Sequence, residues 1–501
     1  MPTAPFYPIV YIRGYAGTQG EVEDTVADPY MGFNLGATKI RQKWTQEITR
    51  HVFESPVIRL MKDHDYRDVY EGGEELPVEE EPPDRAIYIY RYYEPVSRDL
   101  GSGQRPEMES YAEGLHDFIE QIRDHYCGPA DNQDAERKQA REEFRVHIVA
   151  HSMGGLIARC YLQNVCRKKG IRPPVDRVVT YATPHGGIDF RVVGNVPSFF
   201  SRNNVDNFNR RRMREYLAIQ DDDTPVTALD GAFPPERFLC LVGTNHRDYT
   251  AAQGVSRRAV GSMSDGLVRI QNAVVDRAPR AFMHRAHSGH YGIVNSEEGY
   301  QNLRRFLFGD VRVDVRLAFD EITLPPQVAR RKEDGHQIRA SYHVETVVRV
   351  RGERTSLHRR TTEDESALFV DYDRYVKGEK SSYLASIFLM DAARINRRRR
   401  SLGFSVDLRV LVPEYVVDGR WFRRDHFEGG YLFREKLNLD LTLDDEDTKL
   451  RWGLDTATPN RSSRTAEMQK RDDQYTFSIP VEQNTRPGLK GHLIVTASAH
   501  E

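Results

Sequence analysis

Residues 144–155 read F-R-V-H-I-V-A-H-S-M-G-G, and this stretch decides the fold of the chain. An apolar run ends at Ser152, and two glycines and apolar residues at helical spacing follow at once. This order predicts a buried strand, a tight turn and a helix, with the serine presented on the turn. Ala150 and Gly154 stand two positions to either side, and a turn this sharp needs small neighbours.

The helix expected after Ser152 has a recognisable end. Its apolar stripe is closed by Gly170, the residue type that most often ends a helix. The stripe consists of Leu156, Ile157, Cys160 and Tyr161. In the alternative interpretation, Ser152 only caps a buried helix.

Strand-like and helix-like segments alternate through the first part of the chain. Apolar strands are expected at 9–12, 86–93, 144–149, 178–182 and 238–243, with amphipathic helices between them. Such alternation implies a mostly parallel sheet with helices on both faces. We therefore expect an α/β domain over residues 1–310.

The pattern changes near residue 310 to strict alternation of apolar and polar residues. This period is typical of antiparallel strands with one buried face, so residues 311–501 are expected to form an all-β, sandwich-like domain. The alternating stretches begin at Val311, Phe404, Leu437, Tyr475 and Leu493. The run Arg397–Arg400 in this half is interpreted first as solvated surface and second as a patch for an anionic partner.

Composition limits the class of protein. The chain has 501 residues, which favours two domains, and its formal net charge of -3 argues against nucleic acid as the main partner. The four cysteines show neither metal-ligand spacing nor a disulfide framework, so a reducing compartment is expected. No signal-like N-terminus and no long apolar run is seen, so we expect a cytoplasmic protein as synthesised, with signal-independent export left open.

A serine nucleophile needs a base and an orienting acid, and in this fold class the acid and then the base follow the serine in the chain. The first choice of acid is Asp265 in G-S-M-S-D-G-L-V-R-I, where Gly266 leaves room for a turn. The runner-up is Asp248, just after the strand expected at 238–243. A plain turn aspartate is the alternative for Asp265.

The base is expected on a loop before the last helix of the first domain. Residues 297–308 fit that helix, and H-R-A-H-S-G-H-Y-G-I stands directly before it. We choose His290, the histidine nearest the helix, with His287 as second choice. The spacing of His284, His287 and His290 also suggests a metal site, but intervening glycines disfavour a helix and no further ligand follows, so no metal and no cofactor is expected.

An acyl-transfer site also needs donors for an oxyanion. One expected donor is the backbone N–H of Met153, directly after the nucleophile. The second is the backbone N–H of Tyr15, on the glycine loop after the first strand. In the alternative, this loop only turns the chain.

Together, these motifs resemble those of the α/β-hydrolase lipases, especially the bacterial lipase and PGAP1-like esterase group. They are Y-I-R-G-Y-A-G (11–17), A-H-S-M-G-G (150–155), Y-A-T-P-H-G-G (181–187), S-D-G-L-V (264–268) and the late histidine. The resemblance covers about residues 8–308, and in that group the D-G-L-V segment supplies the acid. Ala150 and Arg13 depart from the usual residues at their positions.

The resemblance implies a serine carboxylic-ester hydrolase of lipase or phospholipase type, acting on lipid acyl esters and touching a membrane surface peripherally. It also implies that the insertion at about 188–235, which mixes apolar residues with arginines, forms a lid; packing onto the sheet is the alternative. An acyltransferase on the same scaffold, or a binding protein with a relic hydrolase domain, remain alternatives. Protein partners are not indicated.

Overall fold

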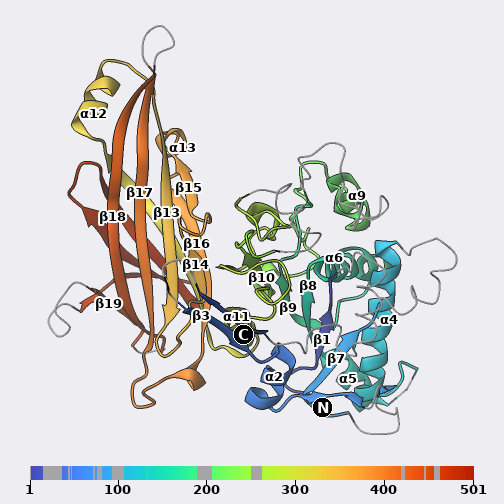
Figure 1. Ribbon diagram of the computed structural model, residues 1–501. Coiled ribbons are helices and arrows are strands. Elements are labelled where there is room, and N and C mark those ends of the chain that lie inside the picture. Colours follow the sequence, from blue (N-terminus) through green and yellow to red (C-terminus); the bar gives the residue numbers. More distant parts are fainter. Residues whose placement is uncertain are drawn as a thin grey trace. The chain divides into compact units, whose positions relative to one another are not determined.

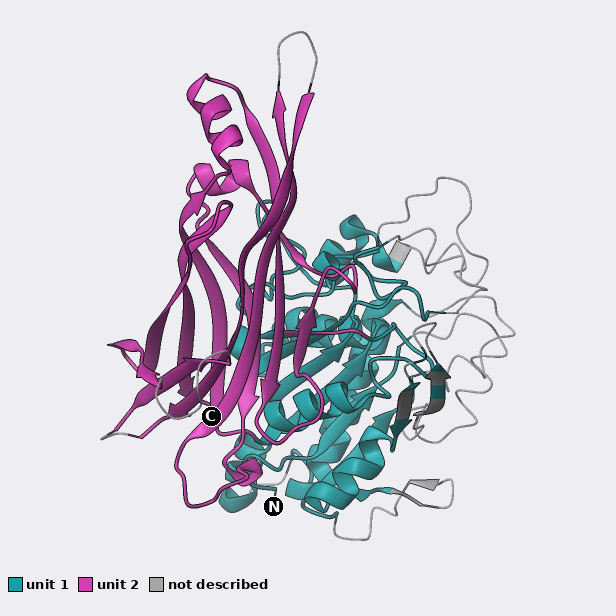
Figure 2. Cartoon of the chain, turned by 60° about the vertical axis from the view of Figure 1, so that its left-hand side comes forward, with its two compact units in different colours: residues 1–280, 285–308 teal, residues 281–284, 309–501 magenta. Residues whose placement is uncertain are grey.

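The structure is a computed structural model of the chain. It describes residues 2–14, 37–42, 46, 48–71, 74–75, 82–92, 107–131, 134–188, 206–249, 262–418, 424–444, 447–455 and 463–500. The chain divides into two compact units (Figure 2). Unit 1 comprises Met1–Arg280 and Arg285–Phe308, and unit 2 comprises Ala281–His284 and Gly309–Glu501.

Unit 1 is built on the consecutive strands β10 to β4 of a seven-stranded sheet whose order is β11-β10-β9-β8-β1-β7-β4. The neighbouring strands from β4 to β10 pair in parallel. Strands β1, β9 and β10 are buried along their whole length, as expected for inner strands of a parallel sheet. The strands are β1 (Ile9–Ile12), β4 (Arg67–Asp68), β7 (Ala86–Tyr90), β8 (Val146–His151), β9 (Val175–Tyr181), β10 (Phe238–Gly243) and β11 (Arg280–Met283).

Helices flank this sheet, so the α/β expectation is confirmed. Figure 1 shows α4 and α6 on one side of the sheet and α11 on the other. The helical elements of unit 1 are α2 (Pro56–His64), α4 (Met108–Cys127), α5 (Ala135–Glu143), α6 (Met153–Cys160), the π-helical η1 (Tyr161–Val165), α7 (Cys166–Lys169), η2 (Asp206–Phe208), α9 (Arg210–Tyr216), η3 (Pro235–Arg237), η5 (Ile270–Asn272) and α11 (Glu297–Phe308). Two small hairpins complete it: β2 (Ala37–Gln42) with β3 (Ile48–Phe53), and β5 (Tyr70–Glu71) with β6 (Glu74–Glu75).

Alternate residues of β9 fasten α11 to its face of the sheet. The buried Arg177 donates to the carbonyl oxygen of Phe306 at 2.6 Å, and the Tyr181 hydroxyl donates to that of Gly299 at 3.1 Å. Ser296 caps the helix by accepting the Gly299 N–H at 3.1 Å. The start of α11 is therefore fixed close to the end of β9.

Unit 2 consists of two antiparallel sheets. Their orders are β16-β12-β23-β22-β21 and β14-β13-β17-β18-β19-β20, and β15 pairs with β13. Strands of both sheets contribute to one buried apolar cluster, as in a sandwich. The elements are β12 (Val311–Thr323), α12 (Pro326–Glu333), β13 (Ile338–Val350), β14 (His358–Arg360), β15 (Leu368–Asp371), α13 (Tyr372–Val376), β16 (Ser381–Leu389), η6 (Asp391–Ala393), β17 (Leu402–Asp418), β18 (Arg424–Thr442), β19 (Lys449–Leu454), β20 (Arg464–Thr465), β21 (Glu467–Arg471), β22 (Gln474–Gln483) and β23 (Gly488–Ala499).

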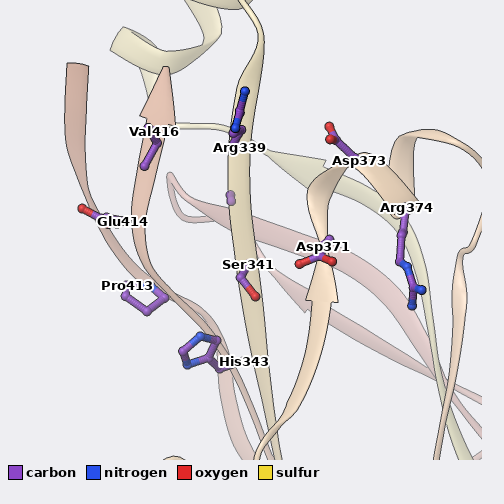
Figure 3. Close-up of a pocket in the computed structure, with 10 residues that line it drawn as sticks. Arg339, Ser341, His343, Asp371, Asp373, Arg374, Pro413, Glu414 and Val416 are labelled. Carbon is purple, nitrogen blue, oxygen red and sulfur yellow. The ribbon is translucent and has the colours of Figure 1, made fainter. Parts of the chain in front are cut away.

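A groove of about 520 Å³ crosses β13, β15 and β17 on unit 2 (Figure 3). Its lining mixes cationic and anionic side chains. Arg339 is paired with Asp418 at 2.8 Å and Glu414 contacts His426 at 2.9 Å, so part of this charge is already neutralised within the protein.

The cysteines of the chain are buried free thiols. Within the residues that the structure describes, no helix combines the length and the apolar character needed to cross a membrane.

Candidate active site

Ser152 stands at the turn between β8 and α6, where the sequence predicts it. Its φ of 53° and ψ of -123° lie in a region that side-chain-bearing residues rarely adopt, at a cost of about 1–3 kcal/mol. Neighbouring backbone holds this conformation. The Ser152 N–H donates to the carbonyl oxygen of Tyr181 at 2.9 Å, and the Thr183 hydroxyl donates to the Ser152 carbonyl oxygen at 2.9 Å.

Glycines let three segments meet at this turn. A Cβ on Gly154 would lie 2.4 Å from the carbonyl oxygen of Ile12, so α6 can begin against the end of β1 only without a side chain there. A Cβ on Gly14 would lie 2.6 Å from the Cβ of Ser152. The loop after β1 therefore touches the serine itself.

Asp265 is held by backbone N–H groups of its own turn through one carboxylate oxygen, and the other oxygen contacts a histidine. Its Oδ1 atom accepts the N–H groups of Leu267 at 2.9 Å and of Val268 at 2.7 Å. Gly243, the last residue of β10, makes room for it, because a Cβ there would lie 2.8 Å from the Asp265 Cβ. The side chain is buried, and its Oδ2 atom points to His287.

His287 lies between this carboxylate and the serine. Its Nδ1 atom is 2.9 Å from Asp265 Oδ2, and its Nε2 atom is 2.9 Å from Ser152 Oγ. The His287 N–H also donates to the Asp265 carbonyl oxygen at 3.0 Å. The residue is only 3% exposed. These distances allow a proton to pass from the serine hydroxyl to the imidazole while the carboxylate fixes the ring.

The ring of His287, the second choice for the base, lies between Ser152 and Asp265, where the sequence analysis expected His290. The loop doubles back: the Ala286 N–H donates to the Tyr291 carbonyl oxygen at 3.0 Å, and the Ile293 N–H returns to the Ala286 carbonyl oxygen at 2.9 Å. His287 stays at the base of this loop, and His290 is exposed near its tip. Sequence distance from α11 therefore did not reflect distance from the serine.

The other expected site residues are Asp248, Met153 and Tyr15. Asp248 lies in a local turn, where its Oδ2 atom accepts the side-chain N–H of Asn245 at 2.7 Å, while Asp265 takes the position beside the histidine ring. Met153 is the first residue of α6, where backbone N–H groups have no acceptor within the helix. Tyr15 lies outside the described residues.

His151, directly before the serine, was not singled out from the sequence. Its Nε2 atom is 2.9 Å from the His287 carbonyl oxygen, so this nitrogen carries the proton that it donates. Burial, reinforced by the neighbouring His287 ring, lowers the pKa of His151 to about 3. The residue is therefore neutral at ordinary pH and ties the backbone of His287 to the strand that carries Ser152.

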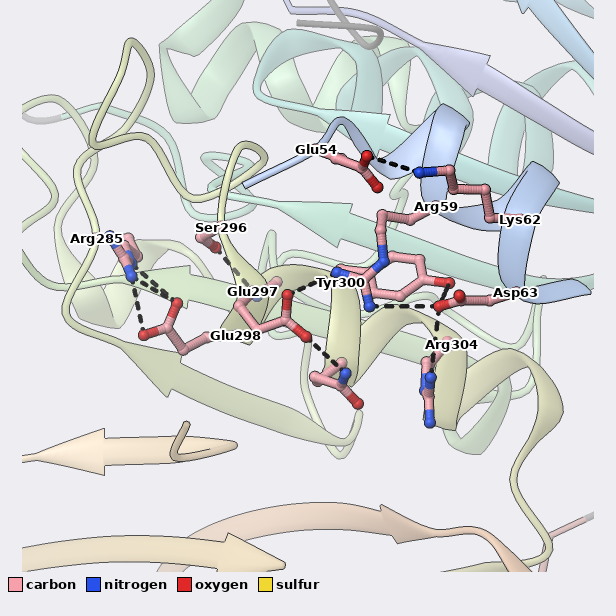
Figure 4. A network of polar contacts seen from close by, with 12 residues as sticks. Glu54, Arg59, Lys62, Asp63, Arg285, Ser296, Glu297, Glu298, Tyr300 and Arg304 are labelled. Atoms are coloured by element: carbon pink, nitrogen blue, oxygen red, sulfur yellow. Dashed lines mark hydrogen bonds and ion pairs between the residues drawn. The ribbon is translucent and has the colours of Figure 1, made fainter. Parts of the chain in front are cut away.

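A second tie runs from the histidine loop to α11 (Figure 4). The Arg285 guanidinium, two residues before His287, contacts the Glu298 carboxylate through three hydrogen bonds of 2.8–3.0 Å. The same network joins α11 to α2, because Arg59 pairs with Glu297 at 2.7 Å and the Tyr300 hydroxyl donates to Asp63 at 2.8 Å. Bidentate arginine–carboxylate contacts carry geometric specificity, so this network orients the loop.

A buried cation supports the helix behind the serine. Arg159 of α6 donates to Gln163 Oε1 at 2.9 Å and to the carbonyl oxygens of His185, Val226 and Ala228 at 3.2, 2.8 and 2.8 Å. Burial lowers the pKa of this guanidinium to about 10. Its side chain fastens the T-P-H-G loop and the segment near residue 227 to α6.

The described part of the 188–235 insertion packs against the helical segment that follows Ser152. The carbonyl oxygen of Tyr216 accepts from Cys160 Sγ at 3.1 Å and from Asn164 Nδ2 at 2.9 Å, which fixes α9 to the helix that follows the serine. The arginines of α9 are also engaged, since Arg212 contacts Glu109 at 2.8 Å. Residues 189–205 of the insertion lie outside the described residues.

His284, His287 and His290, whose spacing suggested a metal site, are not grouped around a common point in the described residues. The His284 ring lies 3.6 Å from an oxygen of Asp364, and His287 lies between Ser152 and Asp265. Throughout the described ranges, no group of three or more His, Cys, Asp or Glu side chains is arranged to hold a metal ion.

A match to a family model agrees with the fold of unit 1. Residues 101–230 match the family model described as "PGAP1-like alpha/beta domain". No curated protein matches the chain. Three solved structures illustrate the level of structural likeness. The mature lipase BlEst2 of Bacillus licheniformis has 13% identity, 61% coverage of this chain and 93% of its own, and a TM-score of 0.33. Phospholipase PlaB of Legionella pneumophila has 12% identity, covers 80% of this chain and 86% of its own, and has a TM-score of 0.32. A putative cell surface hydrolase of Lactobacillus plantarum WCFS1 has 12% identity, covers 61% of this chain and 92% of its own, and has a TM-score of 0.27.

The family match spans both the serine turn and the T-P-H-G segment that the sequence analysis compared with lipases. The parallel sheet, the serine turn after β8 and the helices on both faces belong to the same unit. Residues 101–230 are therefore similar to the PGAP1-like alpha/beta domain, and they lie within a unit that has the α/β-hydrolase fold.

Proposed function

We propose that the chain is a serine hydrolase of carboxylic esters, with Ser152 as nucleophile, His287 as base and Asp265 as the orienting acid. One observation carries this proposal: the His287 ring reaches Ser152 Oγ through one nitrogen and Asp265 Oδ2 through the other, each at 2.9 Å. The order serine, acid, histidine along the chain is that of α/β hydrolases.

In the proposed reaction, Ser152 Oγ attacks the ester carbonyl carbon while its proton moves to His287 Nε2. The protonated imidazole then gives this proton to the alkoxide leaving group, which departs as an alcohol and leaves an acyl-serine. Water attacks the acyl-serine, and its proton returns through His287 to release a carboxylic acid and free serine. Asp265 keeps the imidazole oriented, because its Oδ1 atom is fixed by two backbone N–H groups.

The negative charge on the substrate oxygen needs donors fixed before the reaction. The Met153 N–H at the start of α6 is the proposed first donor, where the helix dipole also favours negative charge. The Tyr15 N–H stays the proposed second donor. Its support is the neighbouring Gly14, whose backbone lies against Ser152.

The proposed substrates are lipid acyl esters, including phospholipids. The support for this class is the set of motifs shared with α/β-hydrolase lipases, from the glycine loop at 11–17 to S-D-G-L-V at 264–268. A hydrolase of such substrates is also proposed to contact a membrane surface peripherally.

The test is a series of p-nitrophenyl esters of increasing acyl length, measured beside intact phospholipid with purified protein. We expect hydrolysis, with kcat/KM rising with chain length and release of fatty acid from phospholipid. Hydrolysis confined to acetate-sized esters would remove the lipid class while leaving the ester hydrolase. No hydrolysis of any ester would contradict the proposal itself.

A further inference from the structure

A strongly basic loop stands on unit 2 between β16 and β17. Within residues 394–400 five arginines accompany the exposed Ile395. The side chains of Arg397, Arg398 and Arg399 are exposed and make no hydrogen bond or ion pair with the described part of the chain. Uncompensated guanidinium groups in such a cluster form a local positive surface on a chain whose net charge is -3.

The loop has a defined conformation. Arg394 donates to the Arg399 carbonyl oxygen at 3.0 Å and also contacts the Asp391 carboxylate. Ile395 lies on the turn after β13, because a Cβ on Gly352 would come within 2.9 Å of its side chain. The arginines are therefore presented by a structured loop.

This loop covers a small hollow lined by three guanidinium-bearing residues. The hollow has a volume of about 130 Å³, and no carboxylate is among its lining residues. Besides apolar residues, the lining consists of Arg351, Arg394, Asn396, Arg399, Ser401 and Gly403. Two of the charges are partly neutralised from the side, by Asp440 at 2.9 Å from Arg351 and by Asp391 beside Arg394. Arg399 brings an uncompensated charge. The apolar lining includes Leu389, Met390 and Ile395.

We propose that this hollow and its arginine rim bind the phosphate group of an anionic membrane lipid, and that Ile395 enters the boundary of the acyl chains. Guanidinium groups bind phosphate through paired hydrogen bonds, and clusters of four to eight basic residues attract anionic membranes. Ile395 is 67% exposed, and an apolar residue beside arginines matches the layered chemistry of a lipid interface.

The exposed isoleucine favours a lipid surface over nucleic acid as the source of the phosphate. Nucleic acid presents a charged backbone and offers an isoleucine no apolar phase, whereas a membrane places acyl chains directly beneath its phosphates. The choice of a lipid also rests on the proposed function, since a lipid hydrolase must meet its substrate at an interface.

The experiment uses full-length protein carrying Ser152→Ala, so that binding is measured without hydrolysis. Co-sedimentation is measured with vesicles of phosphatidylcholine alone and of phosphatidylcholine with phosphatidylglycerol. The test variant is R397Q/R398Q/R399Q. The matched control is R330Q/K377Q/R471Q, which removes the same charge from three exposed, separated sites of unit 2.

We expect binding to the anionic vesicles, and a loss of about 100-fold in partition for the R397Q/R398Q/R399Q variant, because each basic residue near such a surface contributes about five-fold. The dispersed control should stay within about two-fold, because isolated surface charges are screened. Ile395→Ser should lower partition onto anionic vesicles by about five-fold, since it removes apolar area from the membrane boundary.

Equal losses in the triple variant and the dispersed control would overturn the site, because binding would then follow net charge. Binding of inorganic phosphate or duplex DNA through these arginines, without vesicle binding, would overturn the lipid assignment. Hydrolysis of a soluble ester by R397Q/R398Q/R399Q with Ser152 intact distinguishes a failure of this proposal from a failure of the proposed function. Vesicle binding can be lost while ester hydrolysis persists, and vesicle binding can persist in a protein that hydrolyses no ester.

Discussion

The Nε2 atom of His287 lies 2.9 Å from the Oγ atom of Ser152, although 135 residues separate the two in sequence. The contact forms because β8 delivers the serine and the loop after β11 delivers the histidine to the same edge of the sheet. In open α/β sheets this carboxyl edge is where ligands bind. The proximity of these two side chains is therefore a result of the topology.

The two nearby histidines should differ sharply when replaced. His287→Ala removes the group that accepts the serine proton, so we expect kcat to fall by about 10⁶-fold, as for loss of a triad histidine. His290→Ala changes an exposed loop residue and should leave kcat within about two-fold. Steady-state hydrolysis of a soluble p-nitrophenyl ester measures both. A large effect of His290→Ala with a small effect of His287→Ala would reverse the assignment.

The two candidate acids give a parallel test. Asp265→Asn keeps the shape of the turn but no longer holds the imidazole in the working tautomer, so kcat should fall by about 10⁴-fold. Asp248→Asn changes a carboxylate that contacts Asn245, and activity should change little. If Asp248→Asn proves the more damaging of the two in the same assay, Asp265 is not the acid.

His151 is expected to act by position. His151→Phe keeps a ring but leaves the His287 carbonyl oxygen without its donor, and kcat should fall by about ten-fold with KM unchanged, as for one lost buried hydrogen bond. His151→Gln can still donate and should recover most of the rate. The pH profile should keep its position in both variants, because the His151 pKa near 3 lies below the working range. Equal loss in both variants, or a shifted profile, would show a different role.

Acid should destabilise the protein through its buried histidines. Burial lowers the pKa of His147 to about 4, against about 6.5 in an unfolded chain. Between these values the unfolded state binds the proton and the folded state does not, so the free energy of unfolding falls as the pH drops from about 6.5 to 4. The contribution of His147 is about 3 kcal/mol at the lower limit.

Urea unfolding followed by circular dichroism across this range tests the expectation. His147→Gln can keep a donor for the Pro5 carbonyl oxygen, 2.8 Å from the ring in the wild type, but cannot titrate. The variant should lose less stability on acidification than the wild type. Identical pH slopes would mean that His147 is not the group responsible.

Local sequence patterns predicted those features of the fold that depend on neighbouring residues. The serine turn, the helix ended by Gly170 and the helix at 297–308 follow from residues next to one another in the chain. Strand β13 was not expected, because polar Glu345 and Thr346 are buried within it and break the alternation.

The choice between His287 and His290 depended on tertiary structure. The backbone hydrogen bonds that close the loop at residues 286–293 determine which histidine ring faces Asp265. The number of residues between each histidine and α11 does not predict this. His287 stands only a few residues after the end of β11, and this position would have favoured it as the base. Strand β11 itself was not expected from the sequence. The role of His151 likewise depends on a segment far away in sequence, because its partner is the backbone of His287.

The central claim is that Ser152 is a nucleophile activated by His287. Labelling with a fluorophosphonate probe, followed by mapping of the modified peptide, measures this most directly, because the probe reacts covalently with an activated serine. We predict labelling at Ser152 in the wild type and in His290→Ala, and loss of labelling in Ser152→Ala and His287→Ala. An unlabelled wild-type protein, or a label that persists in Ser152→Ala, would contradict the account.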